Sequence, residues 1–132
     1  MKKYWAIILG LLFASCIYDP ADSRARIVNQ AAYEITLYYG LDTIPLDQNH
    51  TEFYLSNTVK SNDTVRLRAY NADWPSLVEE STNKKLNLFV YNVDSLKAYN
   101  DIDLMTARKK YTRYQYTLKE LEEMNWIIVV KK

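Results

Sequence analysis

The sequence predicts a single, mainly β domain with sandwich-like antiparallel sheets and short helical insertions, and an α+β domain is the alternative. Three observations lead to this expectation. Apolar and polar residues alternate in several segments, one segment is apolar on both faces, and the helical segments are short with their own start signals. The stretch from residue 27 to residue 132 has the length of one domain and can bury one core.

Alternation of apolar and polar residues marks the expected strands. The pattern is clearest over residues 33–39, where the odd-numbered side chains share one face. Residues 64–70 repeat it, with arginines on the polar face. Residues 86–93 are apolar on both faces, which indicates a central strand. The expected strands are therefore 33–39, 64–70, 86–93 and 126–130, with 52–55 and 111–116 as weaker candidates.

Two short helices are expected near the middle of the chain. Asp73, followed by Pro75, favours a helical turn over residues 76–80, because an aspartate caps the free N–H groups and proline fits the first turn. Asp94 is expected to cap a helix over residues 95–99 in the same way.

A capping box predicts a third helix near the end of the chain. Thr117 and Glu120 have the spacing at which each side chain bonds the backbone N–H of the other, and Asn125 is the expected stop. Residues 102–110 offer a further helical piece. Apart from that piece, no segment has the length of a crossover helix, so antiparallel pairing is expected.

The first 16 residues have the features of an export signal. Lys2 and Lys3 precede an apolar run over residues 4–13, and small residues then lead to Cys16. A membrane-spanning helix needs about 20 apolar residues, roughly twice the length of this run. A cleaved signal is therefore expected in place of a retained span.

The residues Phe13-Ala14-Ser15-Cys16 resemble the lipobox of bacterial lipoproteins, in which the cysteine receives a diacylglyceryl group before cleavage. Phe13 stands where leucine is usual. The alternative is an ordinary signal peptide followed by an unrelated cysteine, but Cys16 is the only cysteine in the chain. The expected division is a lipoprotein signal peptide over residues 1–15, a lipid anchor and flexible tether over 16–26, and a single β-rich domain over 27–132.

The charge balance argues against a nucleic-acid partner. The chain carries 17 basic and 16 acidic residues. Removal of residues 1–15 takes away Lys2 and Lys3 and no acid, which leaves 15 against 16. Because no basic stripe or polybasic segment survives in the sequence, the lipid on Cys16 is the expected link to the membrane.

Few residues are suited to catalysis. Gly40 is the single glycine after the signal segment, which excludes a P-loop, a dinucleotide fingerprint and a nucleophile elbow. His50 is the single histidine and is expected to be solvated, since a zinc site or a triad needs further partners. Neighbouring acids such as Glu122 and Glu123 fit a solvated helix start. We expect no enzyme, no cofactor and no metal.

Tyrosine is the compositional excess, with 12 in the chain. Most of these tyrosines fall in predicted strands, where tyrosine is favoured. A second interpretation is an exposed aromatic patch that binds a glycan or a protein. Its candidate members are Tyr38, Tyr39, Tyr70, Tyr111, Tyr114 and Tyr116.

The stretch Ile27-Val28-Asn29-Gln30 and the segment 114–126, YQYTLKELEEMNW, resemble small uncharacterised lipoproteins of gut-dwelling anaerobic Gram-negative bacteria. The resemblance is tight only in the late segment. It implies an envelope location and no activity. Three Asp-Ser/Thr-aliphatic triplets are similar to the O-glycosylation acceptors of such bacteria, and they are also ordinary turn and cap residues. Their acceptor residues are Thr43, Thr64 and Ser95.

These observations together predict a non-enzymatic lipoprotein of the cell envelope that acts as a binding or accessory module. Ile17 is not the aspartate that retains lipoproteins in the inner membrane of other Gram-negative bacteria, so the outer membrane is expected, with its periplasmic or surface face left open. The alternatives are an immunity or inhibitor-type lipoprotein that occupies a toxin or enzyme, and a glycan-binding surface lipoprotein. Trp126 is expected to be a core anchor.

Overall fold

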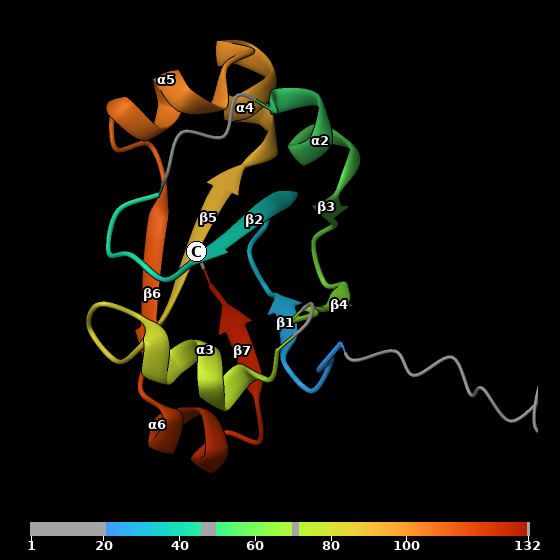
Figure 1. Cartoon of the computed structure of the whole chain (residues 1–132). Helices are drawn as coiled ribbons and strands as arrows, with labels where there is room; N and C mark the ends of the chain where they lie inside the picture. The colour runs from blue at the N-terminus through green and yellow to red at the C-terminus, as the bar shows by residue number, and fades with distance from the viewer. Residues whose placement is uncertain (1–20, 46–49, 70–71, 132) are drawn as a thin grey trace, which may run out of the picture.

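The computed structural model describes residues 21–45, 50–69 and 72–131, whose strands form two sheets connected by short helices (Figure 1). Strand and helix make up 31% and 30% of the described residues, so the predicted β-rich class with short helical insertions is confirmed, and the α+β alternative fits equally well. The signal segment, Cys16 and Tyr70 lie outside the described residues. The elements in chain order are β1 Arg26–Asn29, β2 Ile35–Gly40, α2 Thr51–Ser56, β3 Thr58–Val59, β4 Thr64–Arg66, α3 Trp74–Glu80, β5 Leu86–Asn92, α4 Val93–Tyr99, α5 Ile102–Ala107, β6 Thr112–Tyr116, α6 Leu118–Glu123 and β7 Ile127–Val130.

The larger sheet has the strand order β3-β2-β5-β6, and every neighbouring pair is antiparallel. β5 lies between β2 and β6, and all but the last of its residues are buried. Leu88 packs into one hydrophobic core and Phe89 into another on the opposite face. The central position predicted from two apolar faces is confirmed.

The smaller sheet has the order β4-β1-β7. β4 is shorter than the strand predicted over residues 64–70. β1 pairs antiparallel with β4 and parallel with β7, where Ile27 lies opposite Ile128. The expectation of antiparallel pairing is therefore wrong for β1 and β7. These strands stand at opposite ends of the described chain, so no hairpin constrains their direction, and the parallel register buries both isoleucines completely.

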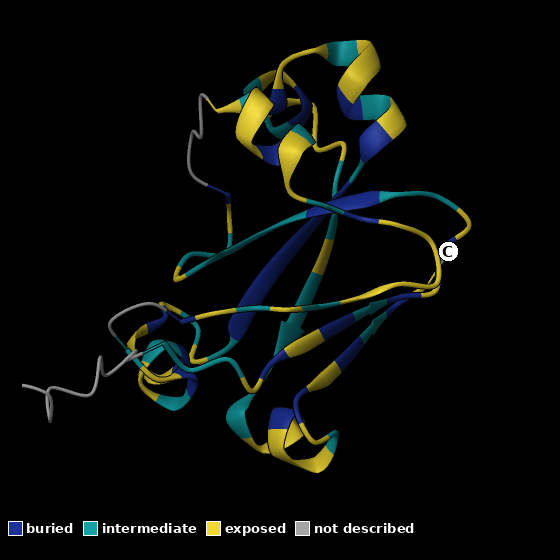
Figure 2. Cartoon of the chain, turned by 90° about the vertical axis from the view of Figure 1, so that its right-hand side faces the viewer, coloured by how far each residue is buried: buried dark blue, intermediate teal, exposed yellow. Residues whose placement is uncertain are grey.

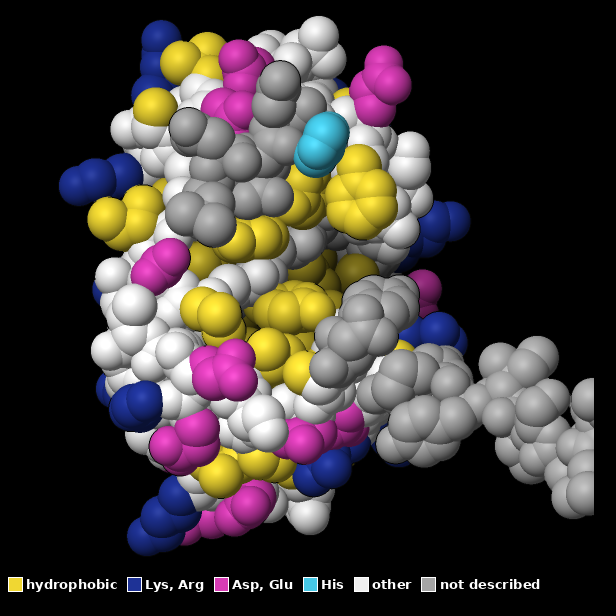
Figure 3. Space-filling view, in the orientation of Figure 1, with side chains coloured by type: hydrophobic (Ala, Val, Ile, Leu, Met, Phe, Trp, Pro, Cys, Tyr) yellow, Lys and Arg dark blue, Asp and Glu magenta, His cyan; other side chains and the backbone are white. Residues whose placement is uncertain are grey.

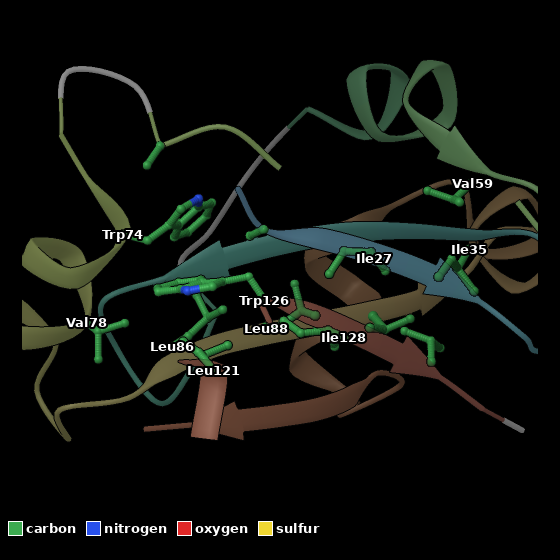
Figure 4. Close-up of a cluster of buried hydrophobic side chains, with 14 residues drawn as sticks. Ile27, Ile35, Val59, Trp74, Val78, Leu86, Leu88, Leu121, Trp126 and Ile128 are labelled. Carbon is green, nitrogen blue, oxygen red and sulfur yellow. The ribbon is translucent and has the colours of Figure 1, made fainter. Parts of the chain in front are cut away.

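The first core lies between the inner faces of the two sheets, as expected for a sandwich-like arrangement. Figure 4 shows Trp74 and Trp126 in the same part of this core, close to Leu86 and Leu121. Trp74 is completely buried and Trp126 is 7% exposed, which confirms the predicted core position of Trp126. Trp74 belongs to α3 and Leu121 to α6, so these two helices cover that end of the sandwich (Figure 1).

The second core lies on the outer face of the larger sheet, beneath α2, α4 and α5 (Figure 2). β5 contributes Phe89 and Tyr91, while the helices contribute Tyr54, Leu96 and Ile102. These helices form a third layer whose exposed residues face outward. β5 therefore supports two cores at once.

The strand predicted over residues 52–55 is wrong, because these residues belong to the helix α2. The helical turn carries Tyr54 into the second core, and the hydroxyl of Thr51 accepts the N–H of Ile102 at 3.0 Å. These contacts with distant residues outweigh the strand preference of the aromatic side chains.

The domain begins before the boundary expected at residue 27. Asp22 forms a bridge with Ala69, Ala25 is completely buried, and Arg26 is the first residue of β1. The polar composition of this stretch predicted a tether, but its backbone pairs with the segment that follows β4. Residues 22–26 are therefore part of the folded domain.

The helix caps agree with the sequence in two cases and differ in one. Asp73 accepts the N–H of Ser76 at 2.8 Å, and the capping box before α6 is complete, as predicted. Asp94 lies in the first turn of α4, whereas the actual cap is Asn92, which accepts the N–H of Ser95 at 2.9 Å. Asn92 ends β5 in an extended conformation, which suits a capping residue.

Within the described part of the chain, the helices are too short or too polar to cross a lipid bilayer.

Candidate functional site

A groove of about 690 Å³ lies between β2 and β4, beside α2. Figure 3 shows this face of the molecule, with apolar side chains gathered in a hollow near its middle. The lining residues come from β2, α2, β3, β4 and the segments next to them. They are Leu37, Tyr38, Tyr39, Phe53, Tyr54, Ser56, Asn57, Thr58, Val59, Val65, Arg66, Leu67 and Arg68.

The floor of the groove is an unsealed part of the first core. Leu37, Tyr39, Val65 and Leu67 pack against that core but are only half-buried. The hydroxyl of Tyr39 donates to the backbone oxygen of Arg68 at 2.7 Å, and this bond connects the β2 side to the segment after β4. Because the four apolar side chains are only half-buried, apolar surface remains accessible between the two sheets here.

One wall of the groove is an incompletely paired edge of the larger sheet. β3 is the neighbour of β2 on this side, and it pairs only with Ile35 and Thr36. β2 continues to Gly40, so Leu37 and the residues after it extend beyond Thr58, the first residue of β3. The opposite wall is β4, which is an edge strand of the smaller sheet. A groove with a strand edge on each side offers backbone N–H and C=O groups to a partner.

The charged side chains that the structure describes in the lining are both basic. Arg66 and Arg68 are exposed, and no acidic residue of the described ranges lines the groove. The tyrosines add neutral hydroxyl groups. Burial raises the pKa of Tyr54 above its usual range, and nearby Tyr38 adds to that shift. The groove therefore combines an apolar floor, hydroxyl groups and positive charge, which suits an amphipathic partner with acidic groups.

Two of the predicted patch tyrosines lie on the helical side of the larger sheet. The Tyr38 and Tyr111 rings both contact Phe89, with ring centres 5.7 and 5.4 Å from it. Phe89 is completely buried, so this row of rings belongs mainly to the second core.

The other described members lie on the opposite face of that sheet. Tyr39, Tyr114 and Tyr116 pack against the first core. Tyr39 makes an edge contact with Trp74 at 4.9 Å, while Tyr114 and Tyr116 stack at 6.4 Å. The five described tyrosines therefore do not form one continuous patch, and only Tyr38 and Tyr39 line the groove.

A second hollow of about 630 Å³ lies between α5, the start of β6 and the loop after β2. Its lining includes Asp103, Lys109 and Arg113. Arg113 donates to the backbone oxygen of Thr43 at 2.6 Å, so this guanidinium already holds the loop against β6. The mixture of charges and this structural bond make the second hollow the weaker candidate for a binding site.

The predicted acceptor residues of glycosylation lie in three separate places. Thr64 is exposed on the edge strand β4, Thr43 is half-buried in the loop after β2, and Ser95 is half-buried in the first turn of α4. The side chains of Asp63 and Asn92 accept the backbone N–H groups of Thr64 and Ser95, as in ordinary turns and caps.

The residues considered as catalytic candidates in the sequence lie apart from one another in the structure. His50 is exposed and precedes α2 without a side-chain capping bond. Asp101 caps α5 by accepting the N–H of Leu104 at 2.9 Å. In the three described ranges, no group of three His, Cys, Asp or Glu side chains could hold a metal ion.

Phe53, Arg66 and Arg68 line the groove but were not among the candidate site residues predicted from the sequence. Arg66 and Arg68 had a signal, because they occupy the polar face of a predicted strand at alternate positions. Phe53 had none, since its position beside the groove depends on α2 being a helix. It is 59% exposed, which is unusual for a side chain of that size.

No protein-family model, curated protein or solved structure matches the chain.

Proposed function

We propose that this chain is a lipid-anchored, non-enzymatic binding module of the outer membrane, and that the groove between β2 and β4 receives its partner. The observation that carries the proposal is the groove itself. It exposes part of the first core, is flanked by two strand edges, and has Arg66 and Arg68 as its charged lining residues. Exposed apolar surface edged by polar groups is typical of a site for a protein partner.

The proposed anchor is the lipid on Cys16, supported by the lipobox-like residues 13–16 and by the resemblance to envelope lipoproteins. From Cys16 to Asp22, where the described domain makes its first backbone bridge, there are six residues. Even fully extended, these six residues span at most about 20 Å. The domain would therefore work close to the membrane surface.

An immunity or inhibitor-type lipoprotein is a special case of the same proposal, in which the partner is a toxin or an enzyme. Genes beside the coding gene would distinguish it from a general accessory module. The glycan-binding alternative is weaker, because the tyrosines that would form its surface point to opposite faces of the larger sheet.

Replacement of Cys16 tests the anchor. Cys16→Ala should give an exported protein that leaves the detergent phase on partitioning, whereas Ser15→Ala, which keeps a small residue before the cysteine, should partition like the parent. Equal retention of the Cys16→Ala variant in detergent would show that lipid on Cys16 is not the anchor. Density separation of membranes should place the parent in the outer-membrane fraction, and recovery in the inner membrane would contradict the proposed location.

Site-specific cross-linking tests the groove. A photoreactive phenylalanine in place of Phe53, in full chain produced in its own cells, should form a discrete adduct whose protein component mass spectrometry identifies. Leu104 is the matched control, since it is an exposed apolar residue on α5 that does not line the groove. An adduct at both positions, or at neither, would argue against the groove as the binding site.

A further inference from the structure

We propose that the partner enters the groove as an extended, acidic peptide segment that pairs with the edge of β4 and adds a strand to the smaller sheet. This inference rests on the proposed function and specifies the chemistry of its partner. It follows from the direction of the backbone groups on the groove walls, the pattern of side chains above the floor, and the charge of the lining.

The outer edge of β4 presents backbone groups to the groove. The oxygen of Asp63 and the N–H of Leu67 both bond to the β1 side, to Asn29 and Ala25. In an antiparallel strand, the N–H and C=O groups of one residue point to the same side, and this side alternates from residue to residue. The backbone N–H and C=O of Arg66 therefore point away from β1. The sheet order agrees, since β1 is the single strand neighbour of β4 in the described chain.

The register of an added strand is centred on Arg66. The N–H of Thr64 already donates to the carboxylate of Asp63 at 2.8 Å, and the oxygen of Arg68 accepts the Tyr39 hydroxyl. Arg66 lies midway between these two positions. A peptide residue opposite Arg66 would exchange both backbone hydrogen bonds with it.

The edge of β2 faces the same groove. The backbone oxygen of Glu34 accepts the N–H of Val93. The backbone groups of Glu34, Thr36 and every second residue after them therefore point toward β5. The backbone groups of Leu37 therefore point to the opposite side, beyond the two residues of β2 that pair with β3. A strand added to β4 would lie over the apolar floor between two edges, with its second edge toward Leu37.

Side chains of an extended peptide alternate between the two faces of its sheet. On β4, Val65 packs toward the first core and Arg66 is exposed on the other face. An added strand continues this alternation, so one set of its side chains covers the apolar floor and the other lies beside Arg66. Apolar residues alternating with acidic ones satisfy both faces, because cross-strand neighbours of opposite charge are favourable.

Binding of four capped heptapeptides to the full chain in detergent tests the inference. The first peptide alternates valine and glutamate, and the second has lysine in place of glutamate. The other two are the glutamate peptide N-methylated either on its valine amides or on its glutamate amides. The glutamate peptide should bind at millimolar concentration or better, and slow amide exchange at Arg66 more than at Val65. At least one methylated peptide and the lysine peptide should bind about tenfold more weakly, since each loses backbone or charged hydrogen bonds.

Arg66→Glu and Arg26→Glu form a matched pair of variants. The two arginines lie directly opposite each other on β4 and β1, but only Arg66 lines the groove. Arg66→Glu should weaken binding of the glutamate peptide about tenfold and strengthen binding of the lysine peptide, whereas Arg26→Glu should change either affinity much less.

Three results would overturn strand addition. They are no binding of the glutamate peptide, equal affinities of the unmethylated and both methylated glutamate peptides, or an equal effect of the two arginine variants on peptide affinity. If the peptides fail while the Phe53 cross-link still identifies a partner, strand addition is wrong and the binding module stands. Failure of the Phe53 cross-link removes the proposed function itself.

Discussion

Arg26 and Arg66 lie directly opposite each other on the neighbouring strands β1 and β4, and both side chains are exposed. Their neighbours Ile27 and Val65 face the first core, so the arginines share the outer face of the smaller sheet. Like charges in this position repel each other and destabilise a sheet. The chain therefore keeps a local electrostatic cost at the edge of the groove.

Relieving this repulsion should stabilise the domain. Arg26→Glu or Arg66→Glu converts the pair into opposite charges, and each variant should gain about 0.2–1 kcal/mol in the free energy of unfolding. The double variant restores a like-charged pair and should lose that gain. Urea melts of the four proteins at low and high salt would measure the cycle, and a gain that is unchanged by salt would contradict an electrostatic origin.

A second prediction concerns Asn29, which is completely buried at the end of β1. Its side chain donates to the oxygens of Tyr33 and Val59 at 2.9 and 3.0 Å and accepts the N–H of Ala31 at 3.0 Å. Asn29→Leu would leave these groups unpaired, at about 1–3 kcal/mol each. We expect a loss of at least about 3 kcal/mol. The control Gln30→Leu changes an exposed neighbour and should stay within about 0.5 kcal/mol in the same melts.

The capping box of α6 should give the domain an acid-sensitive contribution to stability. The Thr117 backbone N–H, and then its hydroxyl, donate to Glu120 and lower the pKa of that carboxyl below its ordinary value of 4.5. A lowered pKa means that the unfolded chain binds more protons, so this contribution is present above pH 4.5 and is lost as the pH falls through the folded pKa.

Glu120→Gln removes the titrating carboxyl and should reduce the difference between urea midpoints measured at neutral pH and below pH 4.5. Thr117→Ala should cost about 1 kcal/mol at neutral pH, because it removes the capping hydroxyl. If Glu120→Gln has the full pH dependence of the parent, the capping box does not contribute to it.

Elements with a complete local signal could be predicted from the sequence. The alternation that ends at Gly40 identifies β2, and two apolar faces identify β5 as central. The bonds of the α6 capping box lie within four consecutive residues, so Thr117 and Glu120 were sufficient to predict it. In each case the residues that determine the structure are close together in the chain.

Elements that depend on distant residues could not be predicted. Residues 52–55 have strand-like composition, yet Tyr54 and Thr51 make their decisive contacts with the second core and Ile102. The parallel pairing of β1 and β7 joins the first and last strands of the described chain, and alternation contains no information about partner or direction.

The groove belongs to this second class. Its walls come from β2 and β4, and its opening depends on β3 beginning only at Thr58, opposite Thr36, so that β3 does not cover Leu37. The sequence placed Tyr38 and Tyr39 on opposite faces of one strand, which the structure confirms, but grouped them with tyrosines of β6 because aromatic composition was the only visible signal. The partner groups of a site between two sheet edges appear only once the strand order is known.

The last prediction concerns Trp126, which is 7% exposed at the point where α6 leads into β7. Its backbone N–H donates to the oxygen of Leu121 and its own oxygen accepts the N–H of Arg26, both at 2.8 Å. Asn125 and Trp126 both have positive φ angles, 53° and 61°, an uncommon conformation for residues other than glycine. Packing of the indole against the first core offsets the cost of this turn.

Trp126→Ala should therefore cost about 3–5 kcal/mol, a large part of the about 5–15 kcal/mol that stabilises a typical domain. Ile127→Ala is the matched control, since Ile127 is the next residue and is 39% exposed, and it should cost less than about 1 kcal/mol. Urea melts of the full chain in detergent compare the two. If the Trp126→Ala midpoint equals that of the parent while the Phe53 adduct disappears, the indole serves partner binding and not the core. A large shift for Trp126→Ala with little change for Ile127→Ala identifies the buried indole as the residue that holds β7 in the sandwich.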